Sequence, residues 1–420
     1  MATIDVDARE VTVALTAMER VFALRRTVRI PVAHLETVEV LDDAYAAMTG
    51  LRAPGLGLPG YAKVGTWRRR SSATVGVVWG RGSGLRLRAS SGRVRDVILS
   101  LDDPQSAHDR IESVRAGLAA VSAVRIEAEV DLVGELVMPD QARGMLVLLP
   151  GSGPLDRDGD AKGLPLGIQR QLAECLADQG LASIRWDKRG VGESAGDFLA
   201  AGLHDLVADA VAVVRRAEDY GLPVIVIGHS EGAAVAARLA VECPTIRGAV
   251  LLSGYARSGL EVLRWQARAL EADIPGFVRF VLRMLRTDLE KSSEKNRQKL
   301  LRTTTDVARL GGVRVNARWH REFMAYDPAG DLAAASQPML ALGGEHDLQS
   351  PPDDTLRIAD LRSAPTTAHV VDGLSHILRS QEAPTVRTYR ADARSPIDER
   401  VVSMIGTWVD GLLDAPASDR

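Results

Sequence analysis

Two different hydrophobic patterns meet near residue 120 of the chain. Upstream, apolar and polar residues alternate over short runs, which predicts strands with one buried face. These runs are residues 26–31, 37–40, 74–79, 84–89 and 95–100. Downstream, short apolar runs alternate with segments of helical periodicity, which predicts a mostly parallel sheet with helices on both faces. The pattern therefore predicts two domains, residues 1–120 and 121–415.

The first domain is expected to be mainly β, with one helix at its end. A Gly- and Pro-rich segment, residues 51–60, interrupts the strands, and we expect it to be irregular. Asp103-Pro104 then predicts a helix start, since Asp caps helices and Pro suits the first helical position. The Arg-Ile-Pro-Val strand, the Gly/Pro-rich loop and the final Asp-Asp-Pro helix, in this order, resemble a bacterial pleckstrin-homology-like domain.

The second domain shows the alternation most clearly. Residues 124–137 suggest a hairpin, and the apolar strands that follow are 145–149, 182–186, 223–227, 249–252, 338–342 and 368–371, with helices at 167–179, 204–219 and 231–242. Between about 255 and 330 the strands stop and the pattern is helical. We expect this insertion to be a cap over the carboxyl ends of the strands, where such sheets bind ligands. A structural excursion far from the site is the alternative.

The strongest chemical signal is the pentapeptide Gly-His-Ser-Glu-Gly at residues 228–232. A run of β-branched residues precedes it and a helical pattern follows it, which is the context of a nucleophile elbow. The sharp turn presents the serine hydroxyl, and both glycines are needed because side chains there would collide with the strand or the helix. The sequence therefore predicts Ser230 as a catalytic nucleophile.

A nucleophilic serine needs a base, and the base needs a carboxylate that orients it. In an elbow enzyme these follow the serine in the order acid, then histidine. His376 comes just after the last predicted strand and is the expected base, and Asp347 comes just after strand 338–342 and is the expected acid. The alternatives are His346 and His369 for the base, and Glu345, Asp353 and Asp354 for the acid.

Acyl transfer also needs hydrogen-bond donors aimed at the developing oxyanion. The backbone N–H of Glu231, directly after the nucleophile, is expected to supply one. The second is expected from the glycine-containing loop 150–159, with the Ser152 N–H first and the Gly153 N–H next. An ordinary glycine turn is the other interpretation of this loop.

Two longer motifs identify a resemblance. Residues 151–159 read Gly-Ser-Gly-Pro-Leu-Asp-Arg-Asp-Gly, and residues 187–194 read Asp-Lys-Arg-Gly-Val-Gly-Glu-Ser. Residues 123–415 thereby resemble an α/β-hydrolase of the serine esterase type, with dienelactone-hydrolase-like enzymes as neighbours. The resemblance implies a doubly wound sheet and cleavage of short- to medium-chain esters through an acyl-enzyme. Thioesterase, amidase or acyltransferase activity on the same residues stays open. Glu231 departs from the small or apolar residue of many esterases, and whether its carboxylate affects the leaving groups or charged substrates that are accepted stays open.

Three further groups of residues carry weaker expectations. Asp187 and Arg189 are expected to pair with Asp156, Arg157 or Asp158 as loop architecture, with substrate contact as the alternative. The basic run 68–70 is expected to be solvated, with an anionic ligand or membrane surface as the alternative. The apolar residues expected to form either an acyl pocket or the core of the cap are Leu260, Trp265, Phe277 and Phe280.

Composition narrows the class of protein. Of the 420 residues, 46% are hydrophobic and 25% charged, and the net charge is −3, which suits a globular protein and argues against a nucleic-acid binder. Cys175 and Cys243 are isolated and are expected to be small buried hydrophobes. We expect no cofactor and no metal, since no His/Cys/Asp cluster has ligand spacing. A basic N-terminal leader and a long apolar span are both missing from the sequence, which predicts a cytoplasmic protein.

The expected partner is a small-molecule ester substrate. Membrane or protein contact through residues 1–120 stays open, and so does a different class of function, in which the first domain recruits a partner and the hydrolase fold is inactive. An intact set of serine, aspartate and histidine, with a complete oxyanion loop, argues against that second class.

Overall fold

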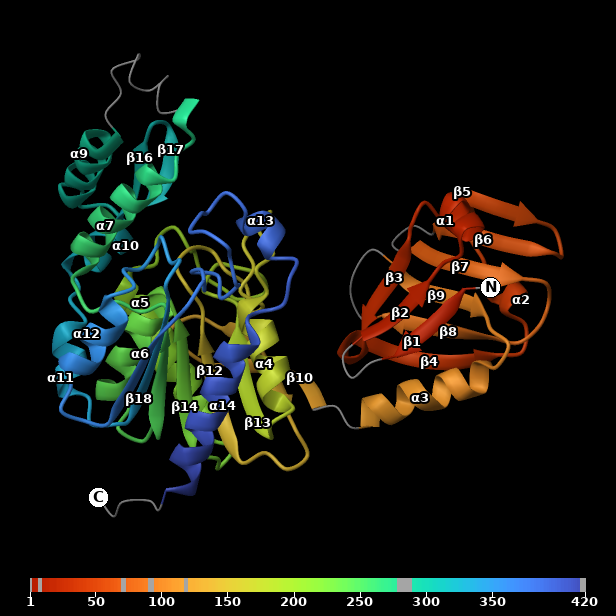
Figure 1. The fold of residues 1–420 in the computed structure, drawn as a ribbon, viewed down its shortest axis with the longest axis horizontal. Coiled ribbons are helices and arrows are strands. Elements are labelled where there is room, and N and C mark those ends of the chain that lie inside the picture. Colours follow the sequence, from red (N-terminus) through yellow and green to blue (C-terminus); the bar gives the residue numbers. More distant parts are fainter. Residues whose placement is uncertain are drawn as a thin grey trace. The chain divides into compact units, whose positions relative to one another are not determined.

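The chain forms two compact units, Met1–Leu118 and Ala119–Arg420. The computed structural model describes residues 2–6, 10–68, 73–89, 94–116, 120–277 and 289–415 (Figure 1). Each unit has its own buried apolar cluster, so each is described by itself.

The first unit contains two sheets and is mainly β, as the alternating pattern predicts. Strands β1 (Thr3–Val6), β2 (Glu10–Ala14) and β3 (Thr27–Pro31) form an antiparallel sheet in that order. The second sheet has the order β4-β8-β9-β7-β6-β5, with β4 Leu35–Leu41, β5 Leu51–Leu58, β6 Ala62–Arg68, β7 Ala73–Trp79, β8 Gly84–Ala89 and β9 Val94–Ser100. The five predicted strands are β3, β4, β7, β8 and β9, which are confirmed.

Short helices complete this unit. They are α1 (Ala17–Ala23), the 3-10 turn η1 (Val32–His34), α2 (Ala44–Ala47) and α3 (Pro104–Ala116). The start predicted for α3 is confirmed, because Asp103 Oδ1 accepts from the Ser106 N–H over 2.9 Å and caps the helix. Ile111 on α3 is fully buried in the same cluster as Val75 and Leu85 of the sheet.

The expectation that residues 51–60 are irregular is wrong. Residues 51–58 form β5, which pairs with β6 at the edge of the six-stranded sheet. The register shifts between Ala53 and Gly55, so Pro54, which has no N–H to donate, falls at the irregularity. An edge strand with a bulge is the place where a sheet accepts proline. The basic run 68–70 lies outside the described residues from Arg69 onward.

The second unit is an eight-stranded sheet covered on both faces by helices (Figure 1). The order is β10-β11-β13-β12-β14-β15-β18-β19, with β10 Ala120–Ile126, β11 Leu132–Met138, β12 Gly144–Leu149, β13 Leu181–Trp186, β14 Val224–His229, β15 Gly248–Leu252, β18 Met339–Gly344 and β19 Thr366–Val371. Strand β11 runs antiparallel to both of its neighbours, β10 and β13, and the strands from β13 to β19 run parallel to one another. The predicted α/β architecture with a mostly parallel sheet is confirmed.

Successive side chains of the central strands pack into two different apolar cores, one on each face of the sheet. Met145 and Val147 of β12 belong to the cluster under helices α5 (Leu203–Glu218) and α6 (Glu231–Glu242). Leu146 and Leu148 belong to the opposite cluster, under α4 (Ile168–Ala177) and α14 (Glu399–Asp414). Strand side chains point to alternate faces, so a strand that is buried on both faces, such as β12, reads as a nearly continuous apolar run.

An insertion between β15 and β18 covers residues 255–338. It contains α7 (Gly259–Ala272), α9 (Leu289–Leu301), α10 (Ala317–Ala325) and α11 (Ala329–Ala334). The expectation that it is helical throughout is wrong, since β16 (Val307–Leu310) and β17 (Val313–Asn316) form a hairpin. Leu310 pairs with Val313 across Gly311 and Gly312, whose φ values of 55° and 85° suit a two-residue turn that requires glycine.

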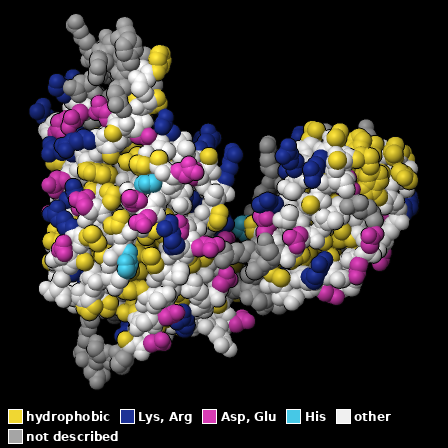
Figure 2. Space-filling view, in the orientation of Figure 1, with side chains coloured by type: hydrophobic (Ala, Val, Ile, Leu, Met, Phe, Trp, Pro, Cys, Tyr) yellow, Lys and Arg dark blue, Asp and Glu magenta, His cyan; other side chains and the backbone are white. Residues whose placement is uncertain are grey.

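The remaining helices of this unit are short or lie at its C-terminal end. They are α12 (Asp354–Asp360) and α13 (Tyr389–Asp392), with α14 as the last element. Within the described part of the chain, every helix is too short or too polar to cross a membrane. Figure 2 shows basic and acidic side chains interspersed on the visible face of the second unit, without a large patch of one sign.

Candidate functional site

Ser230 occupies a strained turn between β14 and α6. Its backbone has φ 56° and ψ −115°, a conformation that residues with a side chain rarely adopt. The Ser230 N–H donates to the Leu252 carbonyl of β15 over 2.8 Å, and its own carbonyl accepts from the Ala233 N–H over 2.9 Å. Strain of this kind persists only where the surrounding structure holds it, and it is concentrated at functional sites.

The two glycines of the motif are required by space. A Cβ on Gly228 would lie 2.0 Å from the Gly232 carbonyl oxygen, and a Cβ on Gly232 would lie 2.4 Å from the Leu149 carbonyl oxygen. Both distances are far below van der Waals contact, so no other residue fits the turn. The two glycines therefore allow β12, β14 and the start of α6 to pack closely against one another.

Asp347 and His376 form a buried pair. His376 Nδ1 lies 3.0 and 2.8 Å from the two carboxylate oxygens of Asp347. Asp347 Oδ1 also accepts from the backbone N–H groups of Gln349 and Ser350, over 2.7 and 2.8 Å. Because these two donors and the histidine surround it, the carboxylate has one orientation, and His376 Nδ1 must carry a proton to bond to it.

His229 connects this pair to the elbow. Its Nε2 lies 2.7 Å from the His376 carbonyl oxygen, and the two imidazole rings have centroids 5.0 Å apart. The strand ends explain the meeting, since β14, β15, β18 and β19 are parallel and their carboxyl ends share one edge of the sheet. Ser230, Asp347 and His376 each follow one of these ends.

The other candidate acids and bases have different partners. His346 Nδ1 contacts the Gln381 carbonyl over 3.0 Å, and His369 lies exposed within β19. Asp354 is fully buried against Arg257, and Glu345 Oε2 accepts from the Gly373 N–H. The structure thus brings Asp347 to His376 and places the alternatives elsewhere. Asp353 Oδ2 lies 3.2 Å from the same Arg257 guanidinium and is mostly exposed.

The loop after β12 lies directly against the nucleophile. A Cβ on Gly151 would be 3.4 Å from Ser230 Cβ and 3.3 Å from His229 Nδ1, so the loop backbone touches the elbow. Among the described residues, none accepts a hydrogen bond from the Ser152 N–H or from the Glu231 N–H. Two backbone donors are therefore available beside Ser230. Gly153, the second choice in the loop, has φ 94°.

The Glu231 side chain, whose role the sequence leaves open, turns into the protein. It is buried, with 3% of its side-chain surface exposed. Oε1 accepts from Lys188 Nζ over 2.7 Å, and Oε2 accepts from Trp319 Nε1 on α10 over 2.6 Å. Both oxygens are engaged, so this carboxylate is not available to a ligand. Sequence reasoning missed the roles of Lys188 and Trp319. Lys188 stands in the motif 187–194, which carries no signal of contact with the elbow, and Trp319 stands in no motif.

The two long motifs pair with each other, as loop architecture predicts. Arg157 contacts Asp187 through Nε over 3.1 Å and Nη2 over 2.5 Å, and its backbone N–H donates to the same carboxylate. Burial works to raise the pKa of Asp187, but the hydrogen bonds from Arg157 and from the Glu193 N–H outweigh it and lower that pKa. The predicted pairing of Arg189 with residues 156–158 is wrong. Arg189 pairs with Asp209 of α5 over 2.7 Å.

The apolar residues expected in an acyl pocket are distributed differently. Leu260 packs with Leu300, Ala317 and Met324 in the core of the insertion. Phe277 is 77% exposed, and Phe280 lies outside the described residues. Trp265 is half-buried on α7. None of the described members of this set therefore contacts Ser230 through a shared apolar cluster.

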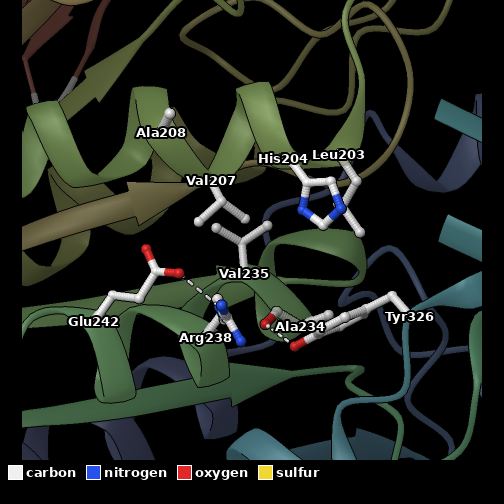
Figure 3. Close-up of a pocket in the computed structure, with 9 residues that line it drawn as sticks. All are labelled: Leu203, His204, Val207, Ala208, Ala234, Val235, Arg238, Glu242 and Tyr326. Carbon is white, nitrogen blue, oxygen red and sulfur yellow. Dashed lines mark hydrogen bonds and ion pairs between the residues drawn. The ribbon is translucent and has the colours of Figure 1, made fainter. Parts of the chain in front are cut away.

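A separate cavity of about 200 Å³ lies between α5 and α6. Figure 3 shows Val207 and His204 of α5 facing Val235 and Arg238 of α6, with Tyr326 at one end. Ser230, Asp347 and His376 are not among its lining residues. The cavity is therefore on the helical side of the elbow and is distinct from the nucleophile.

Neither cysteine adds to the site. Burial raises the pKa of the Cys243 thiol to about 11, so it is protonated and unreactive at neutral pH. Cys175 is half-buried on α4. In the described ranges there is no group of three or more His, Cys, Asp or Glu residues that could hold a metal ion.

The buried His229 makes stability depend on pH. Burial, helped by repulsion from His376, lowers its pKa from 6.5 to about 3, so it is neutral in the folded protein. The unfolded chain takes up this proton below pH 6.5, so stability should be full above that value and decrease as the pH falls towards 3. Between pH 7.5 and 5 the loss should be about 2 kcal/mol.

The check is the free energy of unfolding of wild type and His229→Gln at both pH values. The glutamine amide can still donate to the His376 carbonyl, but it does not titrate. The variant should therefore lose less stability than wild type on acidification. An equal loss in both proteins would show that another group is responsible.

Comparison with known proteins gives one family and several similar structures. Residues 166–382 match the family described as serine aminopeptidase, S33. No curated protein matches the chain. Est1E of Butyrivibrio proteoclasticus, solved with ferulic acid bound, is 17% identical over 70% of this chain and 100% of its own, with a TM-score of 0.48. An esterase of Pyrococcus furiosus is 18% identical over 70% and 92%, with a TM-score of 0.46. A proline iminopeptidase of Mycobacterium smegmatis is 17% identical over 70% and 99%, with a TM-score of 0.48.

Proposed function

The chain belongs to the serine aminopeptidase S33 family of hydrolases, and from this premise we propose that it is a serine hydrolase that cleaves carboxylic esters. The observation that carries the proposal is the strained Ser230 at the strand-to-helix turn, with the Asp347–His376 pair delivered to the same edge of the sheet. Nucleophile, base and orienting acid are the parts that acyl transfer requires.

In the proposed reaction the Ser230 hydroxyl attacks the ester carbonyl, and His376 Nε2 takes its proton. Asp347 keeps the other proton of the ring on Nδ1, so that Nε2 is free to accept. The tetrahedral intermediate collapses as His376 gives its proton to the leaving alcohol, which leaves an acyl-enzyme. A water molecule, deprotonated by the same histidine, then releases the acid and restores Ser230.

The negative charge that develops on the carbonyl oxygen needs donors in fixed positions. We assign the Glu231 and Ser152 N–H groups to this role, with Gly153 as the neighbouring alternative. Their support is that the loop backbone touches Ser230 and that no described residue accepts from either proposed donor. Preorganised donors of this kind contribute a large part of the barrier reduction in acyl transfer.

An ester is favoured over an N-terminal peptide by the state of Glu231. An aminopeptidase must bind the positively charged amino group of its substrate, and an acidic side chain beside the nucleophile would serve that purpose. Here both oxygens of Glu231 are occupied by Lys188 and Trp319. The acid nearest to Ser230 in sequence is thus unavailable, which favours an uncharged acyl group.

The test is a panel of p-nitrophenyl esters from acetate to dodecanoate, with thioester and amino-acid p-nitroanilide counterparts. We expect the highest kcat/KM on short- to medium-chain esters and much lower values on p-nitroanilides with a free amino group. A p-nitroanilide turned over faster than every ester would contradict the ester proposal. A preference for thioesters would indicate that the same residues serve a thioesterase.

For the first unit we propose a pleckstrin-homology-like domain that recruits the enzyme to a partner or surface and takes no part in the reaction. In support, Ser230, Asp347, His376 and the loop that holds Ser152 all belong to the second unit. A cytoplasmic location is part of the same proposal.

A further inference from the structure

A buried ion pair connects the two backbone groups that we assign to the oxyanion. Lys188 Nζ donates to Glu231 Oε1 over 2.7 Å and to the Gly151 carbonyl over 2.6 Å. Only 5% of the Lys188 side chain and 3% of the Glu231 side chain are exposed. The cavity beside them measures about 20 Å³, which is room for one water molecule at most. Solvent therefore does not compete for these contacts.

Because the peptide unit between Gly151 and Ser152 is planar, the contact of Lys188 with the Gly151 carbonyl also fixes the direction of the Ser152 N–H. The Gly151 carbonyl and the Ser152 N–H belong to one trans peptide unit, in which they point in opposite directions. Lys188 holds the carbonyl from the buried side of the loop. The Ser152 N–H is thereby turned to the other side, where Ser152 itself is exposed.

Glu231 brings the second donor into the same arrangement. Its backbone N–H directly follows Ser230, and its side chain holds Lys188. One ion pair therefore fixes the Ser152 N–H relative to the Glu231 N–H. We propose that Lys188 and Glu231 are positioning residues of the oxyanion hole, which act by holding these two donors without touching the substrate. This inference rests on the serine hydrolase function proposed above.

The same ion pair links the oxyanion hole to the insertion. Trp319 Nε1 on α10 donates to Glu231 Oε2 over 2.6 Å, and its ring stacks on Phe323 at a centroid distance of 4.6 Å. Phe323 in turn packs with Ala234 of α6 and with Tyr255. Correct seating of α10 on the elbow thus helps to keep Glu231, and through it Lys188, in place.

The test is the double variant Lys188→Met/Glu231→Gln. Either single change leaves a buried charge without its partner and destabilises the fold, whereas the double change removes both charges. The glutamine can still accept from Trp319. We expect kcat for p-nitrophenyl butyrate to fall about 100-fold, the effect of losing one oxyanion donor, with KM changed by less than about threefold. Affinity for a trifluoromethyl ketone, whose adduct with serine carries an oxyanion, should fall in parallel with kcat.

The neighbouring pair Arg189–Asp209 provides the matched control. It is also buried and bonded over 2.7 Å, and it contacts neither Gly151 nor Glu231. Arg189→Met/Asp209→Asn should change the melting temperature about as much as Lys188→Met/Glu231→Gln does. Its kcat should stay within twofold of wild type. Trp319→Phe, which keeps an aromatic ring against Phe323 but removes the indole N–H, should give a kcat between those of wild type and the Lys188/Glu231 double variant.

Three outcomes would overturn the inference. They are a folded Lys188→Met/Glu231→Gln variant with kcat within twofold of wild type, a control pair that loses as much activity, or a KM effect without a kcat effect. An unchanged kcat in Trp319→Phe would overturn the link to the insertion. If wild type neither cleaves esters nor reacts with a fluorophosphonate, it is the proposed function that has failed, since this inference concerns only the rate of an active enzyme.

Discussion

Replacement of Ser230 by alanine is expected to lower kcat for p-nitrophenyl butyrate by about 10⁶-fold, to the level that binding and oxyanion donors alone support. The substitution removes only the hydroxyl group, and this group forms the acyl-enzyme. Steady-state hydrolysis, with active-site titration of the wild type, measures the effect. Because alanine also has a Cβ, the strain at φ 56° is unchanged, and the melting temperature should stay close to that of wild type.

Ser122→Ala is the matched control for this change. Ser122 is exposed on the edge strand β10, and its loss should leave kcat unchanged. A Ser230→Ala protein that is folded and retains more than about one hundredth of wild-type kcat would contradict an acyl-enzyme on Ser230, since the loss of a catalytic serine is expected to cost about 10⁶-fold.

Asp347→Asn is expected to lower kcat by about 10⁴-fold through the wrong tautomer of His376. The amide oxygen should stay with the Gln349 and Ser350 N–H groups, which already hold Asp347 Oδ1. The amide N–H then faces His376 Nδ1, which must accept, so the ring proton moves to Nε2. A histidine protonated on Nε2 cannot take the proton of Ser230. Hydrolysis of p-nitrophenyl butyrate across pH 6–9 measures the effect.

Asp353→Asn is the control for the acid, because the sequence leaves Asp353 open as an alternative acid. Its side chain is 79% exposed beside Arg257. Its kcat should remain within about twofold of wild type, as expected for a surface ion pair. If Asp353→Asn were the more damaging of the two substitutions, the assignment of the acid would be wrong.

The elements that sequence reasoning predicted well are those with a strong period or a strong capping signal. The strands β12 and β18 contain only apolar residues and glycine because both of their faces are buried, β14 is the same up to His229, and helix α3 begins where Asp103 caps it. The positions of the candidate site residues could be derived too, because each follows the carboxyl end of its strand.

The errors come from local signals that tertiary pairing overrode. Pro54 and its glycine neighbours indicated a loop, but a bulged edge strand accommodates them. Gly311 and Gly312 are a hairpin signal, but the apolar pattern around them has a helical period and favours helix over strand in this segment. Helix α14 was missed, although Val401, Ile405 and Val409 repeat at helical spacing and are buried against the sheet.

The contacts of Glu231 could not have been predicted from sequence. Lys188 lies 43 positions away in the chain and Trp319 lies 88 positions away, and only the packing of the loop after β13 and of α10 on the elbow brings them together. Spacing along a chain carries information about one helix or strand. The contacts of Glu231 with Lys188 and Trp319 depend on how the elbow, the loop after β13 and α10 pack together.

The most direct test of the account is the location of a fluorophosphonate adduct. The wild-type protein, treated with the probe, digested and analysed by peptide mass spectrometry, should carry a single adduct on Ser230, and Ser230→Ala should carry none. Reaction requires a serine activated by a neighbouring base, so an adduct there would establish the nucleophile without knowledge of the natural substrate. An unlabelled Ser230 in a protein that hydrolyses esters, or a principal adduct on another residue, would contradict the account.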